Sequence, residues 1–232
     1  MQESQWVFIK QGLPWPRLRS ATDARPPLRE IPELSSRGTE PERSRGTEPE
    51  RSRGTVPERS RGRLLEVGFG TGLNALLAMR WAEEHRVNVH FTTLETNVLS
   101  MELAEQLNYA SSEQERSDFL KMHAAEWNQD IVITPHFTLH KALREVQSEV
   151  SEEQFDVIFF DAFGPPTQPE MWTPDIFRRM INALKPGGIL VTYCAKGQVR
   201  RDMQSVGFTV ERLPGPPGKR EMLRATKPTL HG

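Results

Sequence analysis

The stretch "RLLEVGFGTGLN", Arg63–Asn74, decides the fold. It opens as an apolar run that only Glu66 interrupts, which is typical of a buried strand. Gly68, Gly70 and Gly72 then follow in the spacing G-x-G-x-G, and a helical pattern begins directly after them. A strand, a glycine-rich turn and a helix in this order predict the first unit of a parallel α/β sheet, whose ligands bind at the carboxyl ends of the strands.

The rest of the chain beyond Arg63 continues this alternation of apolar runs and helical patterns, which predicts a mostly parallel sheet with crossover helices. The clearest helix starts at Thr173 as N-cap with Pro174 in the first helical position, and Pro186 and Gly187 are expected to end it. The expected helices are Gly72–His85, about 97–109, Thr173–Gly188 and Val199–Gly207. The expected strands are Arg63–Gly70, Val87–Thr96, His136–Leu143, Phe155–Phe163 and Ile189–Gly197, followed by a hairpin over Phe208–Thr226 around a Pro/Gly loop.

Composition describes an ordinary soluble α/β protein. The chain has 232 residues, 36 % hydrophobic residues and a formal net charge of −1. It contains no apolar run of about 18 residues, and its first residues lack the features of a secretory signal. The single cysteine, Cys194, excludes an internal disulfide and favours a reducing cytoplasm. His136 and His140 lie in an expected strand without zinc spacing, so we predict no metal site.

A polar repeat precedes the first strand. The eight-residue unit "SRGTEPER" recurs between Ser36 and Arg63. It is too short and too polar to stack as a solenoid, and it offers too little apolar surface to offset the entropy of ordering. We therefore expect an N-terminal segment over 1–35, a disordered repeat insertion over 36–62 and the folded domain over 63–232.

Two acidic residues beside the expected sheet edge indicate the type of ligand. Glu66, just before the glycines, adds negative charge where a dinucleotide would place its pyrophosphate, and the glycine spacing differs from G-x-G-x-x-G. A cationic ligand such as S-adenosylmethionine, with its sulfonium and amino groups, fits better, and Glu66 is expected to be one of its binding residues. Glu95 at the end of the second strand is placed to accept the two ribose hydroxyls, although it could instead cap the following turn.

A second cluster follows the apolar strand Phe155–Phe163. Asp161 ends this run, where an unpaired carboxylate is costly unless it has a function. The sequence "DAFGPPTQPEMW" is similar to the loop of methyltransferases that act on amino nitrogens, in which a carboxylate orients the amine and accepts its proton. Phe163 and Trp172 could stack on a base, and Trp172 could equally pack beneath the next helix.

Basic residues gather near the C-terminus. Seven lysines and arginines stand against three acidic residues within residues 194–224. Lys196, Lys219 and Arg220 are the members expected nearest the substrate. A local basic surface suits phosphate contacts from a structured RNA, and a solvated charged face is the alternative.

Four blocks in order resemble one family. "EVGFGTGLN", "FFDAFGPPTQPEMWT", "TYCAKGQVRR" and "GFTVERLPGPPGKREMLRA" are similar to the MnmC/MnmD family of tRNA 5-aminomethyl-2-thiouridine methyltransferases, over about 63–228. The resemblance implies a Rossmann-like class I methyltransferase fold and S-adenosylmethionine-dependent methylation of the 5-aminomethyl nitrogen of the wobble uridine, giving 5-methylaminomethyl-2-thiouridine. It assigns cofactor contacts to the three glycines and Glu95, the amine contact to Asp161, and the substrate side to Lys219 and Arg220.

The chain departs from the family pattern at two places. The family segment that normally precedes the one similar to "QESQWVFIKQGL" is missing, which predicts reduced or lost cofactor affinity, and the repeat stands where the family has a short connection. No flavin-dependent oxidase domain follows Gly232, so a stand-alone type is expected, with a separate flavin-dependent oxidase or the enzymes that supply the aminomethyl group as partner. The alternatives are a nicotinamide- or flavin-linked oxidoreductase on a similar sheet, and an inactive remnant of the methyltransferase.

Overall fold

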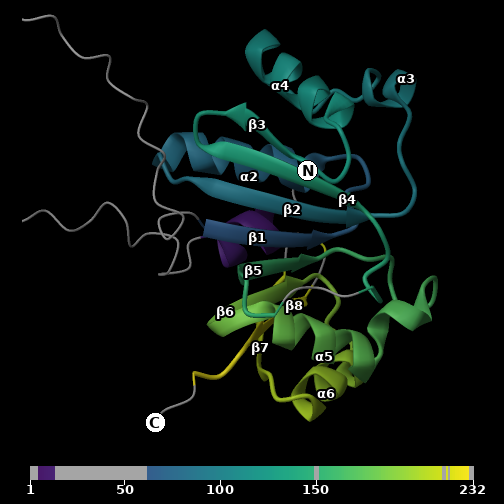
Figure 1. Cartoon of the computed structure of the whole chain (residues 1–232). Coiled ribbons are helices and arrows are strands. Elements are labelled where there is room, and N and C mark those ends of the chain that lie inside the picture. Colours follow the sequence, from purple (N-terminus) through teal and green to yellow (C-terminus); the bar gives the residue numbers. More distant parts are fainter. Residues whose placement is uncertain (1–4, 14–61, 149–151, 216–217, 219, 230–232) are drawn as a thin grey trace, which may run out of the picture.

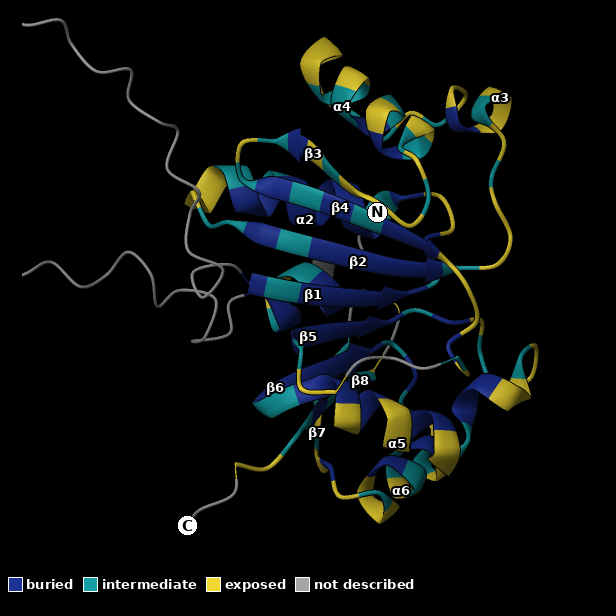
Figure 2. Ribbon diagram, viewed as in Figure 1, coloured by how far each residue is buried: buried dark blue, intermediate teal, exposed yellow. Residues whose placement is uncertain are grey.

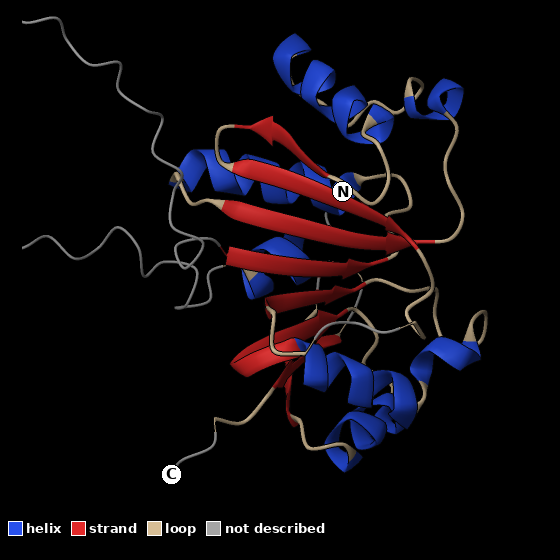
Figure 3. Cartoon of the chain, viewed as in Figure 1, coloured by secondary structure: helices blue, strands red, loops and turns tan. Residues whose placement is uncertain are grey.

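The computed structural model describes residues 5–13, 62–148, 152–215, 218 and 220–229. They form one eight-stranded sheet in the order β3-β4-β2-β1-β5-β6-β8-β7, with helices packed on it (Figures 1 and 3). The five strands from β4 to β6 run parallel, while β3 at one edge and the β7–β8 hairpin at the other run antiparallel. The expected Rossmann-like α/β fold with a closing C-terminal hairpin is confirmed.

The strands have these bounds: β1 Gly62–Val67, β2 Val89–Glu95, β3 Asp130–Thr134, β4 Phe137–Leu143, β5 Phe155–Phe160, β6 Leu184–Thr192, β7 Thr209–Pro214 and β8 Glu221–Thr226. The helices are η1 Gln5–Lys10, α2 Leu73–His85, α3 Met101–Ala104, α4 Glu113–Ala124, η4 Pro169–Trp172, α5 Pro174–Ala183 and α6 Gly197–Ser205.

The core lies on both faces of the sheet, because neighbouring residues of the central strands point to opposite sides (Figure 2). Leu64 of β1 packs with α2, α4 and η1 on one face, whereas Leu65 packs with α5 and α6 on the other. All six residues of β5 are buried, as the continuous apolar run of a central parallel strand predicts. This arrangement brings the carboxyl ends of β1, β2 and β5 to one edge.

The helix at α5 begins as its sequence predicts. The Thr173 side chain accepts a hydrogen bond from the Ile176 amide, and Pro174 occupies the first turn. Ile176, Phe177 and Met180 are buried on one face. The helix ends earlier than expected, at Ala183, because Leu184 already turns to extended backbone and enters β6 ahead of Pro186.

Four elements differ from expectation. The helix expected over about 97–109 is only the short α3, and the sequence analysis did not predict α4 or β3. The N-terminal η1 is also a helix, which places Val7 and Phe8 in the core, with the Phe8 ring 5.1 Å from that of Phe159.

The domain boundaries stay predictions. Most of the N-terminal segment and the repeat up to residue 61 lie outside the described residues, and Gly62 already belongs to β1. Among the described helices, none is long and apolar enough to cross a bilayer.

Candidate active site

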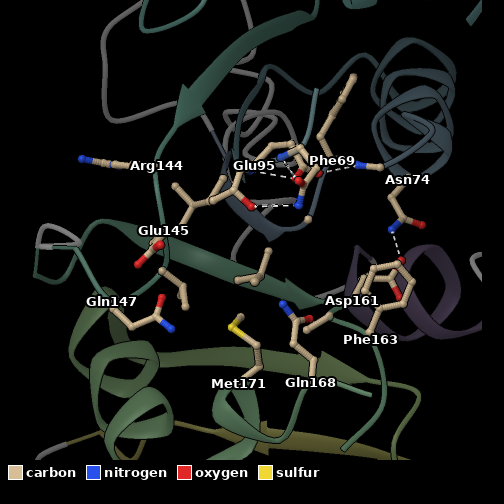
Figure 4. A pocket seen from close by; sticks show the side chains of 18 of the residues that line it. Phe69, Asn74, Glu95, Arg144, Glu145, Gln147, Asp161, Phe163, Gln168 and Met171 are labelled. Atoms are coloured by element: carbon tan, nitrogen blue, oxygen red, sulfur yellow. Dashed lines mark hydrogen bonds between the residues drawn. The ribbon is translucent and has the colours of Figure 1, made fainter. Parts of the chain in front are cut away.

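A cavity of about 530 Å³ opens at the carboxyl ends of the parallel strands (Figure 4). Four loops form its wall: the glycine-rich turn after β1, the turn after β2, the segment after β4 and the long loop after β5. The residues that line it include Gly68, Phe69, Gly70, Asn74, Glu95, Arg144, Glu145, Gln147, Asp161, Phe163, Gln168, Glu170 and Met171. The loops that the sequence marks as chemical therefore meet at one cavity.

The glycine-rich turn uses its glycines in two different ways. Gly70 has a φ of +52° and lines the cavity, and a Cβ added there would meet nothing within 4 Å. Gly72 has a φ of +71° and does not line the cavity; a Cβ there would stand 2.9 Å from His123 Nε2 and 3.1 Å from Phe69 Cζ. Gly70 thus leaves room for a ligand, whereas Gly72 leaves room for the packing of α4.

Glu95 joins the glycine-rich turn after β1 to the turn after β2. Its Oε2 accepts a hydrogen bond from the Gly70 amide at 2.9 Å, and its Oε1 accepts from Thr96 and Asn97 amides at 2.7 and 2.8 Å. The turn-capping alternative raised by the sequence is therefore present in the structure. Because a carboxylate has about four acceptor positions and three amides use one each, Glu95 retains capacity for a ligand hydroxyl.

Asp161 stands where β5 gives way to the long loop, and it is held from across the site. Its Oδ2 accepts a hydrogen bond from Asn74 Nδ2 at 2.8 Å, and Figure 4 shows the Asn74 amide directed at it. Asn74 lies in the first turn of α2, so the glycine-rich unit positions the candidate base as well as a ligand.

The loop that carries Asp161 is fixed by two aromatic residues. Trp172 Nε1 donates to the Phe163 carbonyl at 2.7 Å, and the Tyr193 hydroxyl donates to the Ala162 carbonyl at 2.8 Å. Trp172 is buried and packs edge-on against Phe160 and Phe177, so its packing interpretation holds. Phe163, by contrast, is 72 % exposed while lining the cavity, which leaves its ring available to a planar group.

Glu66 differs from the other expected cofactor residues. It is fully buried in β1 and does not line the cavity. Burial raises the pKa of its carboxyl well above the usual range; the nearby Asn74 and Thr93 lower it in part, and the negative charges of Asp161 and Glu95 raise it further.

The expected substrate-side cations lie apart from the cavity wall. Lys196 is the N-cap residue of α6, Arg220 is an exposed residue just before β8, and neither lines the cavity. Lys219 lies outside the described residues. On the hairpin, Arg224 pairs with Glu211 at 3.3 Å, which neutralises part of the basic cluster.

Sequence reasoning missed several residues of the wall. Asn74, which follows the glycines, was quoted in the motif without a role, although an amide at a helix start beside a ligand loop is a usable signal. Nothing in the sequence pattern marks Arg144, Gln147 or Gln168 as wall residues, because the loops bring them together. Within the described part of the chain, no three His, Cys, Asp or Glu residues converge as a metal site.

The donor set fits a cationic ligand. Among the described residues, the wall carries four carboxylates, Glu95, Glu145, Asp161 and Glu170, against the single guanidinium of Arg144. Such a wall attracts a sulfonium or an amine and repels a pyrophosphate. A parallel sheet with a glycine-rich first turn, a carboxylate ending the second strand and an acidic cavity defines a nucleoside-cofactor enzyme of the methyltransferase class.

Comparisons with known proteins agree. Residues 110–228 match the family model of the S-adenosyl-L-methionine-dependent methyltransferases, and the chain belongs to this family. It is 33 % identical over 169 residues to the tRNA 5-methylaminomethyl-2-thiouridine biosynthesis bifunctional protein MnmC of Pseudomonas fluorescens, covering 68 % of this chain and 26 % of that protein. It is 29 % identical over 161 residues to the MnmC of Pseudomonas putida strain GB-1, covering 65 % and 24 %.

The solved structures give the same fold. The crystal structure of MNMC2 from Aquifex aeolicus superposes with a TM-score of 0.58 at 23 % identity, covering 75 % of this chain and 57 % of that one. The resemblance to the MnmC/MnmD methyltransferases seen in the sequence motifs is thereby confirmed for the methyltransferase domain. The chain spans about a quarter of the length of the curated relatives it matches.

Proposed function

We propose that this chain transfers a methyl group from S-adenosylmethionine to the 5-aminomethyl nitrogen of the wobble uridine of tRNA. The observation that carries the proposal is that one acidic cavity is lined both by the glycine-rich turn with Glu95 and by Asp161 with Phe163. A cofactor side and an amine side therefore share a single space, as a direct transfer between two ligands requires. The curated relatives are named for the biosynthesis of 5-methylaminomethyl-2-thiouridine in tRNA, which supports the choice of substrate.

The cofactor side consists of Gly68, Gly70 and Glu95. Gly70 leaves the floor open, and Glu95 has acceptor capacity beyond the three amides that it binds. Gly72 supports this side indirectly, because it allows the α4 residue His123 to pack against the turn. When bound, S-adenosylmethionine supplies an electrophilic methyl group on a sulfonium.

The amine side is organised around Asp161. Its carboxylate can accept an N–H hydrogen bond and so aim the nitrogen lone pair at the methyl carbon. As the new N–C bond forms, the S–C bond breaks and its electron pair stays on sulfur, which becomes a neutral thioether. The proton released from nitrogen passes to Asp161, and the exposed Phe163 ring is placed to stack on the uracil.

The RNA backbone is expected outside the cavity, because its phosphates would be repelled by the four wall carboxylates. Lys196 and Arg220 are proposed phosphate contacts, with Lys219 as a third from the sequence. A flavin-dependent oxidase, or other enzymes that form the aminomethyl group, is the proposed source of the amine, and the cytoplasm is the proposed compartment.

The experiment is methyl transfer from labelled S-adenosylmethionine to tRNA from cells lacking this last step, read by nucleoside analysis. The expected product is 5-methylaminomethyl-2-thiouridine. Asp161→Asn is expected to lower the rate by on the order of 10²-fold or more. The matched control is Asp175→Asn, which makes the same chemical change at an exposed position in the first turn of α5.

Two outcomes would redirect the proposal. If this chain is inactive on tRNA while a related enzyme works in parallel, the inactive-remnant alternative is correct and the fold assignment still stands. If Asp161→Asn behaves like Asp175→Asn, Asp161 is not the proton acceptor. The family comparison does not support the oxidoreductase alternative. The four carboxylates of the cavity wall also disfavour the pyrophosphate of a dinucleotide cofactor.

A further inference from the structure

Four buried polar atoms without a hydrogen-bond partner gather beneath the cavity. They are both carboxyl oxygens of Glu66, the Asn74 Oδ1 and the Thr93 Oγ1. Glu66 and Thr93 are register partners on the adjacent parallel strands β1 and β2, so their side chains share one face. Asn74 stands over that face in the first turn of α2. A buried polar group without a hydrogen-bond partner destabilises the fold, so such a concentration calls for an explanation.

We infer that Glu66 is a positioning residue: a neutral carboxylic acid that, with Thr93, fixes the Asn74 amide against Asp161. This inference deepens the proposed function, because it concerns the carboxylate assigned to accept the amine proton. It also revises the role that the sequence suggested for Glu66: Glu66 holds Asn74 in position from beneath the cavity and does not contact the cofactor directly.

The donor and acceptor inventory leads to this assignment. An ionised carboxylate only accepts, and the Asn74 Oδ1 only accepts, so an ionised Glu66 can accept from the Thr93 hydroxyl but leaves the Asn74 Oδ1 without a donor. A neutral carboxyl has one O–H donor, which can serve the Asn74 Oδ1, and its other oxygen can accept from the Thr93 hydroxyl. Protonation of Glu66 therefore provides hydrogen-bond partners for both of its own oxygens, for the Asn74 Oδ1 and for the Thr93 Oγ1.

The charges around Glu66 act in the same direction. Asp161 and Glu95 are its charged neighbours from the loop after β5 and the end of β2, and both disfavour a second negative charge. Asn74 from α2 and Thr93 from β2 carry no charge; as hydrogen-bonding neighbours they lower the pKa of Glu66, but burial raises it by more. The register partner of Glu66 on β5 is Phe159. Lys141 of β4 pairs in register with Thr93, but its Nζ donates to the His123 carbonyl at 2.6 Å.

The consequence concerns the orientation of Asn74. An amide can present either its oxygen or its nitrogen to a neighbour, and only Nδ2 can donate to Asp161. A donor from Glu66 to the Asn74 Oδ1 excludes the reversed orientation. The structure shows the resulting contact, Asn74 Nδ2 to Asp161 Oδ2 at 2.8 Å.

The first test does not depend on activity. Thermal unfolding of the wild-type chain and of Glu66→Gln is compared at several pH values from about 5 to about 8. The folded-state pKa of Glu66 lies above its unfolded value, so the unfolded chain releases this proton first as pH rises, and the wild type loses stability that Glu66→Gln keeps. The melting temperature of Glu66→Gln minus that of the wild type should therefore rise with pH.

The control for this test is Glu84→Gln, the same change at an exposed position on α2, whose difference from the wild type should be flat. A flat or falling difference for Glu66→Gln would overturn the inference. Infrared spectra at neutral pH give a second readout: the carbonyl band of a protonated carboxylic acid should be present in the wild type and lost in Glu66→Gln. An equal spectrum in both proteins would also overturn it.

The third test separates positioning from simple support of the fold. Glu66→Ala should lower methyl transfer by on the order of 10²-fold through a misplaced Asp161, and Glu66→Gln, which mimics the neutral acid, should recover most of that loss. Equal losses of methyl-transfer rate in Glu66→Ala and Glu66→Gln would contradict the inference. A shift of the acidic limb of the rate–pH profile to lower pH in Glu66→Gln would also contradict it, because such a shift means that the substitution removed a negative charge. If the wild type itself transfers no methyl group, the proposed function fails, and the unfolding and infrared tests still decide the state of Glu66.

Discussion

Gly70 and Gly72 are two residues apart in one motif, and the structure predicts opposite consequences for the same substitution. Gly70→Ala places a methyl group toward the open cavity, whereas Gly72→Ala places it among His123, Phe69 and Phe119. Both positions have left-handed backbone, with φ of +52° and +71°. The first change should affect ligand binding, and the second should affect folding.

The magnitudes follow from these surroundings. An alanine in left-handed backbone costs about 1–2 kcal/mol, and this applies to both variants. Gly72→Ala additionally forces contacts at 2.9 and 3.1 Å with the rings of His123 and Phe69, and such overpacking costs about 1–3 kcal/mol more. We therefore expect a loss in unfolding free energy of about 2–5 kcal/mol for Gly72→Ala and about 1–2 kcal/mol for Gly70→Ala.

The assays are urea unfolding and calorimetric titration with S-adenosylmethionine. Gly70→Ala should weaken cofactor binding by on the order of 10-fold, equivalent to about 1.4 kcal/mol, because its methyl group occupies ligand space. Gly72→Ala, measured at a temperature where it is folded, should bind more tightly than Gly70→Ala. If the two variants lose stability equally, the reasoning from the surrounding atoms is refuted.

Three further predictions concern particular side chains. Burial lowers the pKa of Lys141 to about 8. Between about pH 8 and about pH 10.5 the unfolded chain holds a proton that the folded chain has released, so the free energy of unfolding should rise with pH in this range. Lys141→Met should abolish this rise when unfolding is measured as a function of pH. The hydrogen bonds from Arg80 lower the pKa of Glu115 to about 2, so its contribution is present above about pH 4.5 and lost towards pH 2, and Glu115→Gln should flatten that part of the unfolding profile. Phe163→Ala should reduce kcat/KM for tRNA by about 10-fold, the equivalent of one lost base stack of about 1–3 kcal/mol, while its urea midpoint stays that of the wild type because the ring is 72 % exposed. A fall in the urea midpoint instead would show that Phe163 supports the loop.

The sequence predicts the fold well where local signals and burial agree. The glycine-rich turn and the capped start of α5 each carry signals that later packing reinforces. Helix α4 was missed because it buries only Phe119 and Met122 and is otherwise polar, which leaves a weak helical pattern. Strand β3 was missed because it pairs on one side only and exposes much of its length.

The candidate site also contains residues that the sequence indicates and residues that only the fold brings together. Gly68, Gly70, Glu95, Asp161 and Phe163 line the cavity because each lies at the carboxyl end of a parallel strand or within three residues after it, and position in the chain alone indicates that end of the sheet. The separate role of Gly72 required the neighbours that α4 supplies. The contact between Asn74 and Asp161 joins residues 87 positions apart, and no local pattern encodes it.

A neutral acid beneath an acidic cavity has a chemical reason. The amine must lose its positive charge before it can attack a methyl group, and every additional carboxylate nearby stabilises the protonated amine. The wall already carries Glu95, Glu145, Asp161 and Glu170, which favour a cationic cofactor. An ionised Glu66 would add a further charge away from the cavity wall, whereas the neutral Glu66 that we propose would supply the hydrogen bonds that orient Asn74 and leave Asp161 as the proposed proton acceptor. In this proposal, the burial of Glu66 maintains the position of Asp161 without adding a negative charge that would oppose the reaction.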